Sequence, residues 1–176
     1  MKAEKWSSFD VNLTNITAII NDEVVKFCLK PLYHIHRVYE IKRRKIQKLF
    51  KSKPKTDRRL MEKYKMRERN RARNFMHKLT TKIARMLVEI KSGAILEDLK
   101  GIKGRTLSKS KKLNRELSKW NARTFQFMLK YKLKWLGFLV KYVNPANSSK
   151  TCLVCSGRLM RCKNVSLLWI EMLWLF

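Results

Sequence analysis

Polar and apolar residues follow two different patterns along the chain. Over the first thirty residues they alternate in short runs bounded by polar turns, which predicts a β-meander with strands over 6–13, 16–20 and 24–29. Beyond that point apolar residues recur every three or four positions. This spacing predicts one helix over 32–50 and a second, longer helix that ends at residue 90.

The remaining pattern adds a strand, a helix and a strand. The apolar run over 94–99 predicts a buried strand, the helical spacing over 113–135 predicts a third helix, and 138–143 predicts a last strand. The element order β-β-β-α-α-β-α-β indicates the α/β class. On the third helix, Trp120, Tyr131 and Trp135 fall on the apolar face, which favours packing in the core over stacking on nucleic-acid bases.

The net charge of the chain indicates the kind of partner that it binds. The chain carries 42 Lys and Arg against 13 Asp and Glu, a formal net charge of +29, while 45% of its residues are hydrophobic. A chain with so many apolar residues can fold, and its excess charge favours a polyanionic partner, nucleic acid before an anionic membrane surface. Residues 40–73 hold 16 Lys and Arg against 4 acids, which we interpret as a surface for phosphate backbones. The alternative is an ordinary solvated helix face.

The start of the chain and its cysteines indicate a compartment. The sequence begins MKAEKWSS, without the apolar region of a signal peptide, and four cysteines are too few for a disulfide scaffold, so we expect a reducing, cytoplasmic location. The most apolar stretch, 165–176, is shorter than the roughly 20 residues that a membrane-spanning helix needs, and Glu171 interrupts it. We therefore expect no membrane span.

Two carboxylates in predicted strands are candidate metal ligands. Asp10 lies in the first strand and Glu97 near the end of a later one. Buried carboxylates are costly unless a positive group pairs with them, and Mg²⁺ prefers clustered carboxylate oxygens. The alternative is that each is an ordinary strand acid that faces solvent. Strand alternation sends Asp98 to the face opposite Glu97, so only one of these two can join Asp10.

Cysteines near the end of the chain have the spacing of a zinc site. Cys152 and Cys155 are separated by two residues, as in a zinc knuckle, and Cys162 follows. A second pair would need a cysteine at position 165, where valine stands, and no histidine lies downstream, so the predicted zinc site is incomplete. Cys28 is expected in the core, and His77 is expected to be a hydrogen-bonded structural residue.

Several blocks of the sequence, in order, resemble the TnpB/OrfB proteins of insertion sequences. The blocks cover 9–17 (FDVNLTNIT), 63–85, 93–105 (GAILEDLKGIKGR), 113–138 and 143–155 (VNPANSSKTCLVC). The resemblance implies a RuvC-type nuclease domain of RNase H-like fold, with a mixed sheet, long basic helices and an inserted zinc ribbon. It also implies DNA and guide RNA as partners, because this family uses a transposon-encoded guide RNA to cut double-stranded DNA.

The same resemblance assigns roles to the candidate residues. Asp10 matches the first catalytic carboxylate and Glu97 the second, and together they would hold two Mg²⁺ ions, one activating water and one stabilising the leaving oxygen. Cys152, Cys155 and Cys162 match three of four zinc ligands. The expected cofactors are therefore Mg²⁺ and Zn²⁺, each in an incomplete site.

The chain also departs from the family. It begins almost at the first catalytic strand, and 165–176 lacks the aspartate motif that supplies the third carboxylate. We expect a partial nuclease domain over 1–143, an incomplete zinc ribbon over 144–165, and an apolar tail over 166–176 that a frameshift at Lys163 and Asn164 explains. The expected function is a nucleic-acid-binding remnant of a transposition-linked, RNA-guided endonuclease that does not cut. A nuclease-dead binder of guide RNA or DNA and a non-functional relic are the alternatives.

Overall fold

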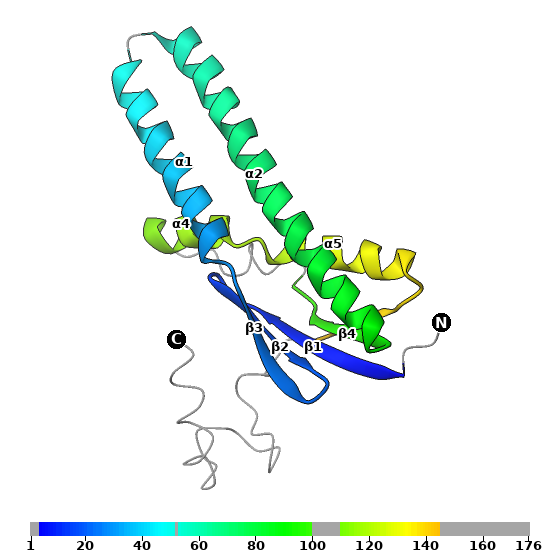
Figure 1. The fold of residues 1–176 in the computed structure, drawn as a ribbon. Coiled ribbons are helices and arrows are strands. Elements are labelled where there is room, and N and C mark those ends of the chain that lie inside the picture. The colour runs from blue at the N-terminus through cyan, green and yellow to red at the C-terminus, as the bar shows by residue number, and fades with distance from the viewer. Residues whose placement is uncertain (1–3, 52, 100–109, 145–176) are drawn as a thin grey trace, which may run out of the picture. The chain divides into compact units, whose positions relative to one another are not determined.

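The computed structural model describes residues 4–51, 53–99 and 110–144 (Figure 1). The chain divides into two compact units, residues 1–143 and 144–176, and the first unit contains five strands and four helices within the described ranges. The strands are β1 (Lys5–Val11), β2 (Asn15–Ile20), β3 (Glu23–Cys28), β4 (Ser92–Glu97) and β5 (Val140–Val143). The helices are α1 (Lys30–Leu49), α2 (Pro54–Glu89), α4 (Lys111–Lys119) and α5 (Ala122–Trp135).

The strands form one mixed sheet in the order β3-β2-β1-β4-β5. β1, β2 and β3 are antiparallel neighbours, β4 runs parallel to β1, and β5 runs parallel to β4. The tight turn between β2 and β3 holds Asn21 and Asp22 at φ of 55° and 65°, a conformation that asparagine and aspartate tolerate better than most residues. The predicted meander and the mixed α/β architecture are therefore confirmed.

The core lies between the sheet and helices α2 and α5, which cover one of its faces (Figure 1). Alternation along the strands turns Phe9 and Val11 of β1 and Leu96 of β4 into this core. The helices contribute residues that are almost fully buried: Met76, Ile83, Leu87, Phe125, Leu129 and Leu133. Residues that alternate with the core positions of β1 and β4 therefore lie on the opposite face of the sheet.

α1 and the first half of α2 form a hairpin that projects away from the sheet (Figure 1). We refer to α1 and residues 54–71 of α2 as the helical arm, because Ala72 is the first residue of α2 that joins the core. Inside the arm, Tyr39 is buried and its ring lies 6.3 Å from the ring of Tyr64. Within the described ranges, no helix combines the length and the apolar character needed to cross a membrane.

The helix predicted over 113–135 is in fact two helices, α4 and α5, with a break at Trp120 and Asn121. The indole Nε1 of Trp120 donates to the Val11 carbonyl at 2.9 Å, and the side-chain amide of Asn121 donates to the Lys119 carbonyl at 2.7 Å. These contacts favour a turn at a point where the apolar spacing alone would continue the helix.

Alternation along β3 corrects another expectation. Cys28 is exposed and not part of the core, whereas Phe27 before it and Leu29 after it are buried. A strand turns successive side chains to opposite faces, so an apolar run does not place each of its members in the core.

Candidate functional site

The two candidate carboxylates lie on neighbouring parallel strands. The pairing of β1 with β4 runs up to Phe9 and Leu96, and Asp10 and Glu97 are the next residue on each strand. Because Phe9 and Leu96 point into the core, Asp10 and Glu97 lie on the opposite face of the sheet. Asp10 is exposed and accepts a hydrogen bond of 3.0 Å from the Asn12 side chain, while Glu97 is half-buried. The fold thus brings both acids level at the carboxyl ends of their strands.

Side chains next to and within α5 hold the ends of both strands. Trp120 donates from its indole to the carbonyl of Val11, the residue after Asp10. Gln126, which is 1% exposed, donates from Nε2 to the Glu97 carbonyl at 2.6 Å. The backbone beside each carboxylate is therefore fixed to the core helices. The sequence pattern did not single out Gln126, although a glutamine on the buried stripe of an amphipathic helix is a signal that it has a partner there.

Paired carboxylate oxygens suit a hard divalent cation such as Mg²⁺. Among the residues that the structure describes, no three His, Cys, Asp or Glu side chains gather in a group that could hold a metal ion, so the candidate site rests on a pair. The amide of Asp98, the next residue after β4, donates to the Val143 carbonyl at 2.7 Å and extends the pairing with β5. The candidate zinc ligands Cys152, Cys155 and Cys162 lie outside the described residues.

The helical arm turns most of its cations outward and two of its acids inward. Every lysine and arginine of α2 is exposed. By contrast, the side chains of Glu40 on α1 and Glu68 on α2 are only 14% exposed, and both are paired with cations. These two acids therefore lie inside the arm, whereas the lysines and arginines of α2 face outward.

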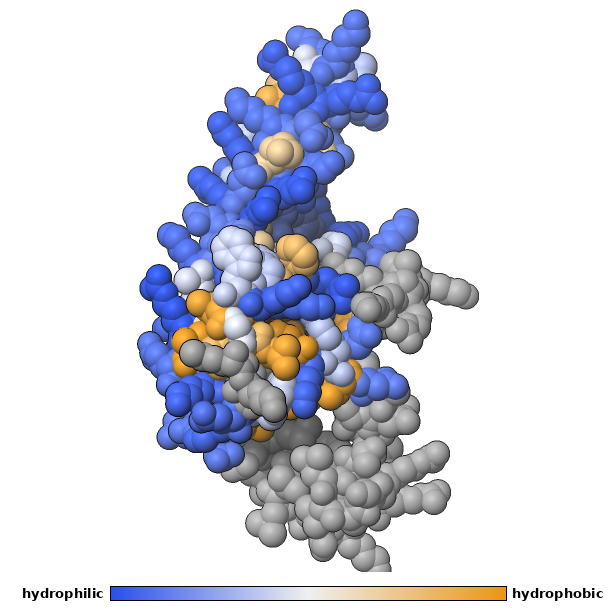
Figure 2. Space-filling model, turned by 90° about the vertical axis from the view of Figure 1, so that its right-hand side faces the viewer, coloured by the Kyte–Doolittle hydropathy of each residue, from blue (hydrophilic) through white to orange (hydrophobic). Residues whose placement is uncertain are grey.

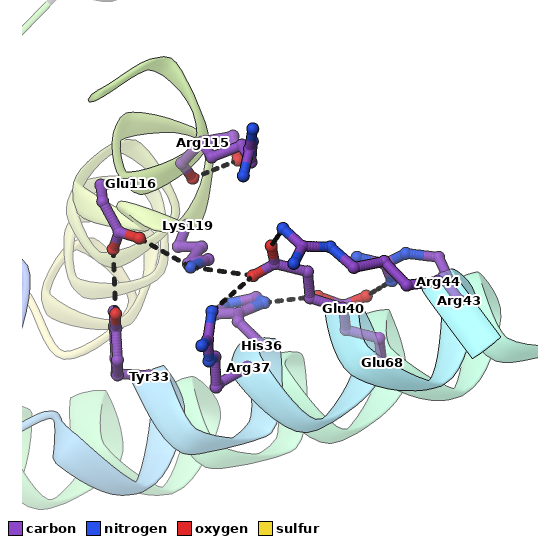
Figure 3. Close-up of polar contacts among 11 residues, drawn as sticks. Tyr33, His36, Arg37, Glu40, Arg43, Arg44, Glu68, Arg115, Glu116 and Lys119 are labelled. Carbon is purple, nitrogen blue, oxygen red and sulfur yellow. Dashed lines mark hydrogen bonds and ion pairs between the residues drawn. The ribbon is translucent and has the colours of Figure 1, made fainter. Parts of the chain in front are cut away.

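Lys119 joins α4 to α1 through a network of ion pairs (Figure 3). Its side chain is 8% exposed, and its Nζ lies 3.1 Å from Glu40 and 2.9 Å from Glu116, which also accepts a bond of 3.0 Å from the Tyr33 hydroxyl. Burial alone would lower the pKa of Lys119, but hydrogen bonds to the two carboxylates raise it above its ordinary value. The bond from Lys119 lowers the pKa of Glu116, and it lowers that of Glu40 against the opposing effect of burial.

Glu68 is the second inward-facing acid of the arm (Figure 3). It is ion-paired with Arg43, and its Oε1 lies 2.7 Å from Nδ1 of His36. The other ring nitrogen of His36 lies 2.7 Å from the side-chain amide of Asn121, at the start of α5. These contacts connect α1, α2 and α5. We refer to the paired polar residues at the base of the arm as the structural clamp; they are Lys119, Glu40, Glu116, Glu68, His36 and Asn121.

Lys132 of α5 locks this helix onto α2. Its Nζ donates to the His77 carbonyl at 2.6 Å and to the hydroxyls of Thr80 and Thr81 at 2.8 and 2.7 Å. Burial lowers the pKa of Lys132, since these neutral oxygens solvate its charge only in part. The lysine therefore connects the two helices.

His77 lies beside this contact and is a hydrogen-bonded structural residue, as predicted. Its Nδ1 lies 3.2 Å from the hydroxyl of Tyr131. Burial, together with the positive charges of Lys132 and Arg73, lowers the pKa of His77. The imidazole is therefore neutral at pH 7, which leaves one ring nitrogen able to accept a hydrogen bond from the tyrosine hydroxyl.

An aromatic ladder, formed by Phe127, Tyr131 and Trp135, runs along α5. Successive ring centroids lie 5.8 and 6.2 Å apart. Phe127 is 70% exposed and Trp135 is 87% exposed, whereas Tyr131 is half-buried and packs against the core. The expectation that Trp135 belongs to the core is therefore wrong. Leu129 and Leu133 belong to the core face of α5, and each lies two positions after a residue of the ladder. Two positions correspond to a rotation of about 200° around a helix, so the ladder lies on roughly the opposite side of α5.

Comparison with known protein sequences gives a consistent result. The family described as Cas12f1-like, TNB domain matches residues 123–169. The TnpB-like protein MJ0751 of Methanocaldococcus jannaschii is 35% identical over 179 residues, which cover 94% of this chain and 64% of that protein. The TnpB-like protein MJ1635 of the same organism is 33% identical over 131 residues, which cover 73% of this chain and 29% of that protein.

Two solved structures share the fold. The cryo-EM structure of a CRISPR-Cas12f ternary complex matches with a TM-score of 0.66 at 21% identity, over 85% of this chain and 30% of that chain. The Cas12f1-sgRNA-target DNA complex matches with a TM-score of 0.61 at 21% identity, over 86% of this chain and 39% of that chain. The present chain thus spans less than two thirds of the length of each of these four proteins.

Proposed function

Because the chain belongs to the TnpB family, we propose that it binds nucleic acid as a protein of the transposon-associated, RNA-guided nuclease type. The observation that carries this proposal is the charge distribution on the helical arm, where every lysine and arginine of α2 is exposed while Glu40 and Glu68 are paired inside. Such a surface attracts phosphate backbones. The Cas12f1 structure of similar fold is a complex with sgRNA and target DNA, which supports guide RNA and DNA as the partners.

The first unit is, in this proposal, a RuvC-type domain of RNase H-like fold whose metal ligands include Asp10 and Glu97. The level placement of both acids at parallel strand ends supports it. Mg²⁺ bound there would activate water and stabilise the leaving oxygen. Asp10 and Glu97 supply hard oxygen ligands, and Gln126 fixes the strand end that carries Glu97. Cys152, Cys155 and Cys162 are the proposed ligands of zinc in an incomplete site.

We also propose that the 176-residue chain by itself binds without cutting. Two-metal hydrolysis needs protein ligands on more than one side of the metal ions, and the described residues provide only a pair of acids. Residues 165–176, where the family resemblance places a third carboxylate, contain no aspartate. The favoured function is therefore binding, and a non-functional relic is the alternative against which it is tested.

Salt dependence of binding tests the proposal. The logarithm of the affinity for duplex DNA should fall steeply with the logarithm of the salt concentration. Replacing two arm cations, Arg59→Gln with Lys63→Gln, should reduce that slope by about 0.9 for each phosphate that is no longer neutralised. The matched control, Lys26→Gln with Lys141→Gln, removes two exposed cations from strands of the sheet and should change the slope less. A soluble protein with no affinity for nucleic acid contradicts the proposal, and failure to obtain soluble protein supports the relic.

The metal site has its own test. Mn²⁺ titration followed by paramagnetic resonance should reveal a site that Asp10→Asn and Glu97→Gln weaken, whereas Asp98→Asn, on the neighbouring residue, should leave it unchanged. With Mg²⁺, family-type guide RNA and target plasmid, the plasmid should remain supercoiled. Linear product that disappears in Glu97→Gln contradicts the absence of cutting. Bound zinc that falls in Cys152→Ser would support the cysteine site.

A further inference from the structure

Two stripes of side chains run along α2 and α5 with the same four-residue spacing. The stripe on α5 consists of Arg123, Phe127, Tyr131 and Trp135, and the stripe on α2 consists of Arg69, Arg73, His77 and Thr81. They meet where the Tyr131 hydroxyl lies 3.2 Å from His77 and where Lys132 donates to Thr81 at 2.7 Å. We refer to both stripes together as the α2–α5 surface.

Grooves in this region are lined by cations. A groove of about 660 Å³ lies between the helices and is lined by Arg69 and Arg73 of α2 and by Arg123 and Phe127 of α5. Glu68 also lines it, but its charge is matched by cations inside the arm. A second groove, of about 550 Å³, continues along α2 and is lined by three cations, Lys78, Lys82 and Arg85, and by one acid, Glu89, among others. Positive charge therefore follows the surface along α2.

Exposed rings stand in this basic setting. Phe127 and Trp135 are 70% and 87% exposed, and apolar residues gather among hydrophilic ones on the side of the molecule that Figure 2 shows. An apolar protein surface docked on the rings would also cover Lys130 and Lys134, whose desolvation would be costly. Nucleic acid fits better, because its bases present π-faces to the rings while its phosphates pair with the cations.

We propose that the α2–α5 surface binds single-stranded nucleic acid, with bases stacked on Phe127 and Trp135 and phosphates on the cations of α2. This rests on the proposed function and deepens it by naming the form of the strand. A duplex hides the faces of its bases, whereas a single strand exposes them. The rings of Phe127 and Trp135 are tilted by 53° and 82° from that of Tyr131, so each ring takes a base of its own and the ladder forms no continuous stack.

Fluorescence anisotropy with labelled oligonucleotides tests this site in the full chain. The probes are oligo-dT and oligo-U of about 12 nucleotides, within the usual range of single-strand site sizes, and a mixed-sequence duplex of the same length. Trp135→Leu and Phe127→Leu keep an apolar side chain but remove the ring, and each should weaken single-strand binding by about 5- to 150-fold. Duplex affinity should change by less than about twofold. The matched control Tyr142→Leu removes an exposed ring from β5 and should leave single-strand binding unchanged.

Two further readouts report on stacking and on phosphate contact separately. Bases stacked on Trp135 should quench part of the tryptophan emission, and that part should be missing in Trp135→Leu. Arg69→Gln with Arg73→Gln should lower the single-strand salt slope by about 0.7 for each phosphate that is no longer neutralised. Comparison of oligo-dT with oligo-U shows whether the site prefers DNA or RNA, and either preference supports it.

Three results would overturn the inference. If Trp135→Leu and Phe127→Leu bind single strands as the wild type does, the ladder is not a stacking site, although the proposed function stands. If the wild-type protein sediments as a dimer, and Trp135→Leu is monomeric with unchanged single-strand affinity, the ladder is an interface between copies. If the wild type binds neither probe, the proposed function itself fails.

Discussion

The side-chain amide of Gln126 donates a 2.6 Å hydrogen bond to the main-chain carbonyl of Glu97. Gln126 is 1% exposed, so this contact ties the core side of α5 to the strand end that carries the candidate carboxylate on its opposite face. The glutamine lies on the core side of the sheet, and its hydrogen bond holds the backbone of Glu97 and not its carboxylate. The packing of α5 and the geometry of the carboxylate pair are therefore coupled.

Replacing Gln126 with methionine should lower stability and loosen the candidate metal site. The change keeps the length of the side chain and removes the donor to Glu97, so we expect the free energy of unfolding to fall by about 1–3 kcal/mol in urea denaturation. Mn²⁺ affinity should fall as well. Gln47→Met, on the exposed side of α1, is the matched control and should alter neither quantity. If Gln126→Met binds Mn²⁺ as tightly as the wild type does, the hydrogen bond does not contribute to the metal site.

Lys119→Met should destabilise the clamp at neutral pH. It would leave Glu40 and Glu116 without their shared cation, and because Glu116 is 30% exposed we expect a loss of about 3 kcal/mol, the lower end for broken buried pairs. Lys45→Met, at an exposed position of α1, is the control.

The pH dependence of that loss follows from the pKa directions. Glu40 and Glu116 have lowered pKa values, so their contribution is present above about pH 4.5 and is lost as pH falls through their folded-state pKa. The raised pKa of Lys119 keeps its contribution below about pH 10.5, and it is lost as pH rises through its folded-state pKa. Urea curves of wild type and Lys119→Met should thus differ most between about pH 5 and 10. A constant difference down to about pH 2 would contradict the ion-pair interpretation.

His77 should make the protein more stable as pH rises through the region just below 6.5. Its pKa is lowered on folding, so the unfolded chain binds more protons there and acidification favours unfolding. His77→Gln can still accept a bond from Tyr131, and it should make the free energy of unfolding depend less on pH in this region. His34→Gln, at an exposed position of α1, should leave that dependence unchanged. Proton NMR of the imidazole gives the direct check, and a His77 pKa above 6.5 is the contrary result.

Gly93→Ala should destabilise the sheet through Trp6. A Cβ at position 93 would lie 2.7 Å from Cζ3 of Trp6, the residue paired with it on β1, and 3.0 Å from the Leu139 carbonyl. We expect a loss of about 1–3 kcal/mol in thermal or urea unfolding. Trp6→Leu should restore part of that loss in the double variant, because only the clash with the indole is relieved. Strictly additive effects of the two changes would exclude the proposed clash.

The local hydrophobic pattern predicted most strands and helices of this fold, because each of these elements shows the regular spacing of its own type. Alternation identified the strands that carry Phe9 and Leu96, and helical spacing identified α1 and α2. The break before α5 was not predicted, since it depends on a bond from Trp120 to Val11, which is 109 positions away in the sequence. Nothing local to either residue signals that contact.

The candidate site shows the same limit. The residue types of Asp10 and Glu97 could be proposed from sequence, but their level placement follows from the register of β1 with β4, which no local pattern specifies. Trp135 was misplaced because α5 carries more than one apolar stripe, and periodicity does not say which stripe meets the sheet.

The inward pairing of Glu40 and Glu68 has a consequence for how the free chain behaves. With those acids paired inside the arm, the exposed lysines and arginines of α2 have few acids beside them, apart from contacts such as that of Lys65 with Glu62, and their mutual repulsion destabilises the folded chain whenever no counter-charge is present. A polyanion that binds the folded arm more tightly than the unfolded chain stabilises the folded state, in proportion to the logarithm of its concentration once the site is mostly occupied. The nucleic acid would then stabilise the folded state by binding to it. The same equilibrium would set both the fraction of protein that is bound and the fraction that is folded.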